Sequence, residues 1–490
     1  MCRSPALVLC FLLAFSLTVN AGGSRLTEHS LTPLSVRSEN GVPIVNPPTR
    51  VAGYFTLDRT YDARMFYFYF QARSPTPETP VVLWMTGGPG CSSELAVFYE
   101  NGPYTINADM TLTENKFGWD VNSHMIFIDQ PIGTGFSYSE DERDRVFDEK
   151  TVGDDMLDFL QEFFAVHPEI ADNDFFVTGE SYAGHYVPTV AHRIWAANRD
   201  GEGKRIPLAG IAIGNGLTDP AIQYGAYGPF ALQNKLISQA VHDGMQFLYP
   251  LCRWGANLCT STGWDWVCGI ALTYCQATTF GTVLALNPGI NVYDISKQCE
   301  GALCYDFTLA DEYLNSKAVR AQLHVNRTWE GCSMDVNADF FSDISRAYDG
   351  LLPEMLADGI RVLIYAGERD LICNWLGNIR WVDSLAWDGA AGWAMASEEP
   401  WLSDGTVAGS VRSSGPLTFL KVASAGHMVP MDQPQAALDM ITTFTRSQGQ
   451  LASKPRNERA AAAERKAAQR SFRGWSLFPG QQQEGKISAA

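Results

Sequence analysis

Short apolar runs typical of buried strands alternate with helix-like segments along most of the chain. Four of these runs are expected to be strands, at 81–83, 175–177, 362–365 and 417–422. Alternating strands and helices are typical of an α/β protein with a doubly wound, mostly parallel central sheet. With 490 residues, of which 46% are hydrophobic, the chain is long enough to bury a large core.

The alternation breaks in one internal segment, residues 217–348, which contains helix-like stretches and a cluster of cysteines. We interpret this segment as a helical cap inserted into the core. The core then has a first half at 46–216 and a second half at 349–447. Residues 448–490 are rich in Ala, Arg and Gln, which predicts a low-complexity tail.

The first residues have the pattern of a secretory signal peptide, residues 1–21. Arg3 precedes an apolar run that ends at Val19, and Val19-Asn20-Ala21 fits a small-residue cleavage site. A membrane anchor is the alternative, but the run is shorter than the about 18 to 20 residues that cross a bilayer. The polar stretch 22–45 is expected to be a leader or pro-segment, and no membrane span is expected in the mature protein.

The chain is strongly acidic, with a formal net charge of −18 at pH 7. No basic patch with interleaved aromatic residues occurs in the part of the sequence expected to fold, so we expect no nucleic-acid partner. Protonation of carboxylates reduces the excess charge as the pH falls, and the composition therefore suits an acidic compartment.

Eleven cysteines occur, and nine remain once the signal peptide is removed. In an oxidising secretory route, nine cysteines predict four disulfides and one free thiol, with many pairings open from spacing alone. No strong zinc-like Cys/His spacing and no His-Glu-x-x-His motif occur, so we expect no metal and no cofactor. Asn326-Arg327-Thr328 is an N-glycosylation sequon, and its use would require Asn326 to lie in an exposed loop.

The most informative motif is Gly179-Glu180-Ser181-Tyr182-Ala183-Gly184, between an expected strand and a helix-like segment. A serine in this position lies on a tight strand-to-helix turn, the nucleophile elbow, where backbone N–H groups can stabilise an oxyanion. Ala183 stands where the usual Gly-x-Ser-x-Gly motif has glycine. Taken alone, the segment also fits an ordinary Gly-rich turn with a solvent-facing serine.

A carboxylate and a histidine follow Ser181 in the chain order of an α/β-hydrolase. Asp370 comes after the expected strand 362–365, and His427 comes after the expected strand 417–422. All three residues lie just past the C-terminal ends of expected strands. In a doubly wound sheet, binding and catalytic sites are usually found at this end of the strands. The order predicts an α/β-hydrolase fold with Ser181, Asp370 and His427 as the catalytic triad.

Five separate motifs, in order along the chain, resemble those of the serine carboxypeptidase family. They occupy residues 84–93, 129–138, 179–184, 367–375 and 426–434. The chain is most similar to the plant-type class III enzymes, whose oxyanion segment also reads Trp-x-Thr-Gly-Gly. The resemblance covers roughly residues 48–447. It implies a serine-type carboxypeptidase that releases amino acids from peptide and protein C-termini through an acyl-enzyme at acidic pH.

The resemblance also implies roles for the residues around the serine. Ser181 is then the nucleophile, His427 the general base and later the general acid, and Asp370 the group that orients the imidazole. The expected oxyanion donors are the backbone N–H groups of Gly88 and Tyr182.

A site for the terminal carboxylate of the substrate makes an exopeptidase out of a serine hydrolase. The resemblance assigns this site to Thr86, the N–H of Gly87, Glu100 and Glu180, with Trp84 supporting the network. Burial and mutual repulsion raise the pKa values of paired carboxyl groups, so that at acidic pH one glutamate can donate a hydrogen bond. Thr86 departs from relatives with asparagine, because a hydroxyl offers one donor where an amide offers two.

The resemblance implies the disulfides Cys91–Cys332, Cys252–Cys275, Cys259–Cys268 and Cys299–Cys304. Cys373 is then the free thiol, three residues after Asp370, where a bulky thiol reagent is expected to block the site. Met428, next to His427, is expected to line the pocket for the leaving residue, and a packed core methionine is the alternative.

Two other functions stay open at this point. An acyltransferase on the same scaffold would use an alcohol in place of water, although Glu180 disfavours it, because transferases of this family tend to carry aspartate before the serine. A protective or binding partner of other hydrolases is the second, since an intact triad does not exclude that role. We expect the protein in a vacuole- or lysosome-like compartment or outside the cell, as a monomer or a homodimer.

Overall fold

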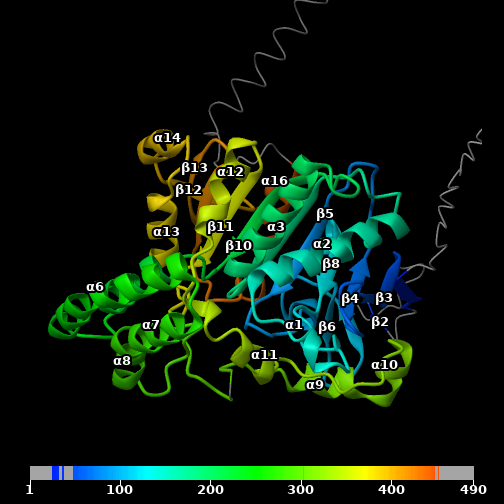
Figure 1. The fold of residues 1–490 in the computed structure, drawn as a ribbon, viewed down its shortest axis with the longest axis horizontal. Coiled ribbons are helices and arrows are strands. Elements are labelled where there is room, and N and C mark those ends of the chain that lie inside the picture. The colour runs from blue at the N-terminus through cyan, green and yellow to red at the C-terminus, as the bar shows by residue number, and fades with distance from the viewer. Residues whose placement is uncertain (1–24, 32–35, 38–47, 302, 447–450, 452–490) are drawn as a thin grey trace, which may run out of the picture.

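A central sheet of eleven strands runs through the molecule (Figure 1). The computed structural model describes residues 25–31, 36–37, 48–301, 303–446 and 451. The expected signal peptide and almost all of the expected tail lie outside these residues. The strand order in the sheet is β1-β3-β4-β8-β5-β9-β10-β11-β14-β13-β12.

The middle of the sheet is parallel and both edges are antiparallel. The parallel strands are β8 (His124–Ile128), β5 (Val81–Thr86), β9 (Phe175–Glu180), β10 (Leu208–Gly214), β11 (Arg361–Gly367) and β14 (Leu417–Val422). The antiparallel strands are β1 (Leu26–Ser30), β3 (Arg50–Thr56) and β4 (Arg64–Phe70) at one edge, and β13 (Thr406–Ser414) and β12 (Glu399–Ser403) at the other. A separate small sheet pairs β2 (Val36–Arg37), β7 (Leu112–Glu114) and β6 (Tyr104–Ile106).

Helices cover both faces of the central sheet, because alternate residues of each buried strand point to opposite sides. In β5, Leu83 packs in the core on one face and Val82 in the core on the other. The first face is covered by α2 (Glu149–Val166), α3 (Ala183–Asp200), α12 (Leu352–Ala357) and α13 (Trp375–Ser384). The second is covered by α1 (Glu94–Tyr99), α9 (Thr308–Asn315), α10 (Lys317–Gln322) and α16 (Pro434–Arg446).

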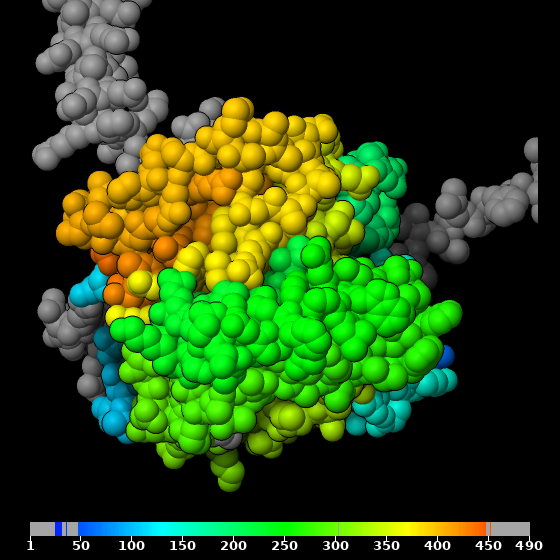
Figure 2. All heavy atoms as spheres, turned by 90° about the vertical axis from the view of Figure 1, so that its left-hand side faces the viewer, coloured from blue at the N-terminus to red at the C-terminus, as the bar shows by residue number. Residues whose placement is uncertain are grey.

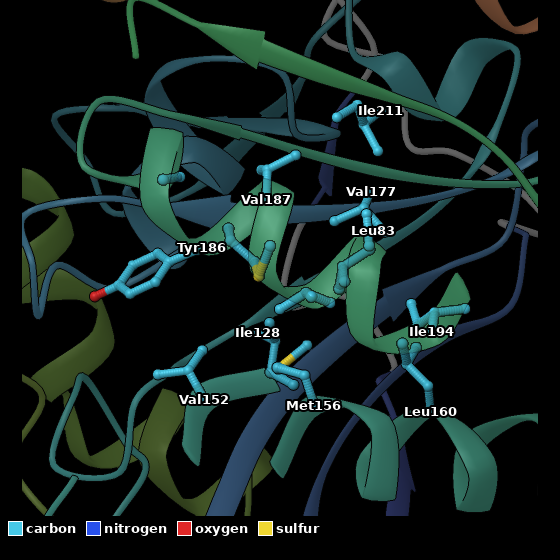
Figure 3. Packing of buried hydrophobic residues seen from close by; sticks show 14 of the residues in the cluster. Leu83, Ile128, Val152, Met156, Leu160, Val177, Tyr186, Val187, Ile194 and Ile211 are labelled. Carbon is cyan, nitrogen blue, oxygen red and sulfur yellow. The ribbon is translucent and has the colours of Figure 1, made fainter. Parts of the chain in front are cut away.

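Figure 3 shows the packing of α3 against the centre of the sheet. Side chains of three adjacent strands, Leu83, Val177 and Ile211, lie near Val187 and Ile194 of that helix. All five are fully buried, so this core fixes the start of α3 relative to the ends of the strands. The fold is the α/β-hydrolase fold that the chain order predicts.

A long insertion separates β10 from β11 in the sequence, and part of it forms a layer beside the core (Figure 2). It contains α4 (Pro220–Gln223), α5 (Tyr227–Gln233), α6 (Gln239–Thr262), α7 (Asp265–Thr278), α8 (Phe280–Leu286), α9, α10, α11 (Met334–Asp339) and α12. Two disulfides, Cys252–Cys275 and Cys259–Cys268, tie α6 to α7. The remaining short helices are α14 (Ala390–Met395), α15 (Val429–Asp432) and the 3₁₀ helices η1 (Trp119–Val121), η2 (Glu142–Asp144), η3 (Tyr224–Ala226), η4 (Asp343–Ser345) and η5 (Asp349–Leu351).

One stretch of the described chain, Asp265–Leu286, is long and apolar enough to cross a membrane by composition alone. It consists of α7 and α8, which are separated at Thr279. Because disulfides tie α7 to α6 and its residues Leu272 and Cys275 are buried, the stretch is packed within the insertion and carries no argument for a membrane span.

Part of the expected leader or pro-segment, Leu26–Ser30, is a strand of the central sheet. This segment, β1, pairs with β3 from Leu26 opposite Phe55 onwards. Arg25 also makes a paired contact with Asp158 of α2 at 2.9 Å. The strand was missed because four of its five residues are polar and it lies at the edge of the sheet, where little apolar periodicity is needed.

Candidate active site

Ser181 lies on the tight turn between β9 and α3, and its φ of 68° places it in the left-handed region. A non-glycine residue keeps this conformation only where its surroundings hold it. The Ser181 N–H donates to the Gly214 carbonyl at 3.0 Å, and the Ser181 carbonyl accepts from Leu217 N–H at 3.0 Å. The end of β10 therefore fixes the strained turn that presents the serine.

Asp370 and His427 form a buried hydrogen-bonded pair. The His427 Nδ1 and the Asp370 Oδ2 are 2.8 Å apart, and the His427 backbone N–H donates to the Tyr293 carbonyl at 2.7 Å. When Nδ1 carries the proton and donates a hydrogen bond to the Asp370 carboxylate, Nε2 is unprotonated and can accept a proton from the serine. Asn215 also donates to Asp370 Oδ2, at 2.7 Å. Sequence reasoning missed Asn215, because nothing in its local sequence indicates a long-range partner.

Ser181 and His427 line the same cavity, which has a volume of about 270 Å³. The structure has no hydrogen bond between the Ser181 hydroxyl and the imidazole. Such bonds are often long in free enzymes and tighten when substrate binds. The three residues predicted as a triad thus lie together, with the Asp–His half already formed.

The Gly-rich loop after β5 lies directly against the elbow. A Cβ atom at Gly87 would be 2.4 Å from the Tyr182 nitrogen and 2.7 Å from the Glu180 carbonyl oxygen, so only glycine fits. Gly88 has a φ of 112°, which also requires glycine. Within the described chain, the N–H groups of Gly88 and Tyr182 donate to no protein acceptor, as expected of groups kept for an oxyanion.

Glu100 and Glu180 face each other in the interior beside the serine, and both are almost completely buried. Burial raises the pKa of Glu100 to about 7. Burial, followed by the charge of Glu100, raises the pKa of Glu180 well above its ordinary value. Trp84 Nε1 donates to the Thr86 hydroxyl at 3.0 Å, and Thr86 lines the cavity together with Gly87 and Glu180. All residues predicted to bind a terminal carboxylate are therefore close together.

The remaining walls of the cavity come mainly from the insertion. They include Tyr293, Leu303, Tyr305, Phe307 and Met334. The Tyr293 ring centroid is 5.1 Å from that of His427, and the Tyr305 hydroxyl is buried without a hydrogen-bond partner. Sequence reasoning did not find these residues, since the loops of the insertion carry no strand or motif signal. Met428 also lines the cavity.

Cys373 is the free cysteine of the described chain, and it is buried. Its N–H donates to Asp370 Oδ2 at 3.3 Å. Burial, and secondarily the charge of Asp370, raises the pKa of the thiol well above its ordinary value. A neutral, buried thiol reacts slowly, so a blocking reagent would need access that this structure does not provide.

The structure contains the disulfides Cys91–Cys332, Cys252–Cys275, Cys259–Cys268 and Cys299–Cys304. These are the pairs that the family resemblance implies. Asn326 lies in an exposed segment without regular structure. Within the described residues, no group of three or more His, Cys, Asp and Glu side chains is arranged to hold a metal ion.

Fold and site together define an α/β-hydrolase with a serine at the nucleophile elbow. Comparison with known proteins gives a more specific result, because the family model described as "Serine carboxypeptidase" matches residues 43–447. The chain therefore belongs to the serine carboxypeptidase family, as its motifs predict. It is a serine-type carboxypeptidase, a hydrolase that acts on peptide C-termini, and the acyltransferase alternative is not favoured.

Individual relatives agree with this assignment. Serine carboxypeptidase 3 of Oryza sativa subsp. japonica is 52% identical over 401 residues, which are 82% of this chain and 79% of the relative. A vacuolar serine-type carboxypeptidase of Saccharomyces cerevisiae is 37% identical over 80% of this chain and 78% of that protein. The crystal structure of a prohormone-processing carboxypeptidase from Saccharomyces cerevisiae has a TM-score of 0.75 at 27% identity, covering 85% of this chain and 95% of that chain.

Proposed function

We propose that Ser181, His427 and Asp370 hydrolyse the last peptide bond of a substrate through an acyl-enzyme. Ser181 Oγ attacks the carbonyl carbon while His427 Nε2 takes its proton and passes it to the leaving amine. The N–H groups of Gly88 and Tyr182 stabilise the tetrahedral oxyanion. Water, activated by the same imidazole, then attacks the acyl-enzyme and restores the serine.

The pair Glu100 and Glu180 carries the proposal that the enzyme reads a free C-terminus. Two buried glutamates facing each other beside a nucleophile hold a proton between them when the pH is acidic. A protonated carboxyl donates a hydrogen bond to the substrate carboxylate, whereas two ionised ones repel it. Thr86 and the N–H of Gly87 complete this site, and Met428 borders the leaving residue. Binding of a free C-terminus is therefore expected to weaken as the pH rises.

Turnover of two matched blocked dipeptides, one with a free C-terminal carboxylate and one amidated, tests this function between pH 4 and pH 8. We expect strong preference for the free acid, fading as the pH rises, and no turnover by the Ser181→Ala variant. Equal turnover of both substrates would be consistent with the catalytic triad but would contradict the proposed site for the terminal carboxylate.

We further propose where the protein acts and how it matures. The disulfides favour an oxidising, secretory route, and the relative named as vacuolar favours a vacuole as the destination. Residues 1–21 would direct entry into the secretory route, and residues 22–45 would form a leader or pro-segment. Residues 217–348 would act as a cap, and residues 448–490 would form a low-complexity tail. The active form would be a monomer or a homodimer, which light scattering of the purified protein distinguishes.

A further inference from the structure

A buried carboxylate of the insertion, Asp343 in η4, lies behind the nucleophile elbow. It accepts three hydrogen bonds: from the Tyr182 hydroxyl at 2.6 Å, from the Tyr348 hydroxyl at 2.7 Å and from Arg346 Nη1 at 3.0 Å. The two tyrosines donate to different oxygens, Tyr182 to Oδ2 and Tyr348 to Oδ1. Asp343 is fully buried. No step of peptide hydrolysis described above uses this carboxylate.

The partner of Asp343 is the residue that supplies an oxyanion donor. Tyr182 follows Ser181, so its side chain and its backbone N–H share one Cα atom. Its ring is stacked on His185 at 4.4 Å and lies edge-on to Tyr186 at 5.1 Å. The hydrogen bond to Asp343 therefore fixes the outer end of a rigid, enclosed side chain. Rotation at the Tyr182 Cα, which would turn the N–H away from the oxyanion, would require breaking that bond.

Backbone contacts of the insertion hold the same turn from another side. The Leu217 carbonyl lies 2.6 Å from His185 Nδ1, and the Leu217 N–H donates to the Ser181 carbonyl at 3.0 Å. The first turn of α3 has no side-chain cap of its own, because Tyr182 at the N-cap position makes no capping hydrogen bond. The Tyr182 hydroxyl instead donates its hydrogen bond to Asp343, and Glu149 of α2 also lies beside it.

Other charged groups around Asp343 keep the phenol a donor. Glu149 of α2 is buried without a hydrogen-bond partner, and burial, followed by the charge of Asp343, raises its pKa well above the ordinary value. Burial and the charge of Asp343 likewise raise the pKa of Tyr182. Arg346 provides the compensating positive charge. Glu149 therefore stays protonated, and the Tyr182 hydroxyl keeps the proton that it donates to Asp343.

We propose that Asp343 is a positioning residue for the oxyanion hole: through the Tyr182 hydroxyl it holds the Tyr182 N–H in the orientation that stabilises the tetrahedral intermediate. The inference rests on the proposed function of that N–H. It also gives the insertion a part in catalysis besides lining the cavity, because the oxyanion donor is aligned only when η4 is packed on the elbow.

The chain offers a matched pair of variants for the test, Tyr182→Phe and Tyr348→Phe. Each removes one hydroxyl donor from the same carboxylate, at nearly the same distance, and both should lower the melting temperature similarly. Outright loss of an oxyanion donor costs about 10²–10³-fold in rate. Misplacement of one should cost about ten- to a hundredfold in kcat for Tyr182→Phe, with KM within about twofold, because an oxyanion forms only in the transition state. Tyr348→Phe should keep kcat within about twofold.

A peptide aldehyde gives a second readout, since its adduct with Ser181 places an oxyanion in the hole. Its affinity for Tyr182→Phe should fall in parallel with kcat, while competitive inhibition by a free amino-acid product stays unchanged. Equal losses of kcat in Tyr182→Phe and Tyr348→Phe, or a change in KM alone, would overturn the proposal. Turnover of the blocked dipeptide by the unaltered enzyme tests the proposed function separately.

The near-isosteric variant Asp343→Asn keeps the inference testable if Tyr182→Phe folds poorly. Asp343→Asn exchanges one carboxylate oxygen for an amide N–H₂ and weakens the acceptor of the Tyr182 hydroxyl, so kcat should fall at unchanged KM. Combined with Tyr182→Phe, it should lower kcat by less than about twofold beyond Tyr182→Phe alone, because both act through the same contact. Losses that multiply would show that the two residues act independently, which contradicts the proposal.

Discussion

Asn215 donates its side-chain amide to Asp370 at 2.7 Å, on the same oxygen that contacts His427. Its Oδ1 accepts from the Gly367 N–H at 3.2 Å, and its own N–H donates to the Tyr365 carbonyl at 2.8 Å. Asn215 therefore connects the end of β10 to the strand that carries Asp370. This connection holds Oδ2 of Asp370 in place, and Oδ2 in turn orients the imidazole of His427.

Replacing Asn215 by glycine should lower kcat by about ten- to a hundredfold, since a hydrogen bond to a charged group contributes about 1.5–3 kcal/mol. Glycine suits the left-handed φ of 42° at this position, so backbone strain does not confuse the result. Steady-state kinetics with the blocked dipeptide measure the effect. Asn198→Ala, which removes a side-chain hydrogen bond to the Ile206 carbonyl, is the control. Full activity of Asn215→Gly would show that Asp370 needs no such support.

A single methyl group at Gly87 should nearly abolish activity. It would lie 2.4 Å from the Tyr182 nitrogen and 2.7 Å from the Glu180 carbonyl oxygen, so either the loop or the elbow must move. We expect Gly87→Ala to lose at least about a hundredfold in kcat/KM, comparable to the loss of an oxyanion donor. Gly244→Ala in α6, where an added Cβ meets nothing within 4 Å, should keep full activity in the same assay.

Local patterns in the sequence predict the central strands and the triad because those features are carried by short segments. The expected strand 417–422 coincides with β14, and Ser181, Asp370 and His427 each follow a strand of the parallel centre. Buried parallel strands must be continuously apolar, and a nucleophile elbow needs small residues two positions from the serine on either side. Such constraints are visible within about ten residues of sequence.

Long-range contacts leave no comparable signal. Asn215 and Asp343 are ordinary polar residues in the sequence, and their roles depend on partners 155 and 161 positions away. The strand β1 was missed for a related reason, since its place in the sheet depends on pairing with β3 and on the contact between Arg25 and Asp158. A polar edge strand has too few buried side chains to show an apolar pattern.

Glu100→Gln should remove the pH dependence of substrate binding. With the pKa of Glu100 at about 7, its carboxyl is neutral and donates a hydrogen bond at lower pH, and it ionises and repels the substrate carboxylate above that value. KM of the unaltered enzyme for the free acid should therefore rise about tenfold per unit of pH beyond that point. Glutamine stays neutral, so the KM of the variant should be nearly constant.

KM for the blocked dipeptide, measured from pH 5 to pH 8, checks this prediction. Glu330→Gln, which neutralises an exposed glutamate, should keep the rise seen in the unaltered enzyme. If the KM of the Glu100→Gln variant still rises with pH, the residue whose ionisation weakens substrate binding is not Glu100.

A second buried carboxyl pair, Glu94 and Asp129, predicts that stability falls as the pH rises. Both groups are fully buried below the oxyanion loop, and the Ser92 hydroxyl contacts Glu94. Burial, followed by the charge of Asp129, raises the pKa of Glu94 well above 4.5, and burial raises that of Asp129. The folded protein thus holds a proton that the unfolded chain releases above about pH 4.5.

The contribution of this proton to the free energy of unfolding is fully present below the pKa that Glu94 has in the unfolded chain. It is lost as the pH rises toward the pKa that Glu94 has in the folded protein. The loss amounts to about 1.4 kcal/mol for each unit of pH in which only the folded state holds the proton.

Glu94→Gln removes this dependence, because an amide keeps the hydrogen bonds of the protonated acid without ionising. Its melting temperature should match the unaltered protein near pH 5 and exceed it by a growing margin up to pH 8. The exposed Glu78→Gln variant should follow the unaltered protein throughout. Parallel curves for Glu94→Gln and the unaltered protein would mean that Glu94 is already ionised in the fold, held by donors that outweigh its burial.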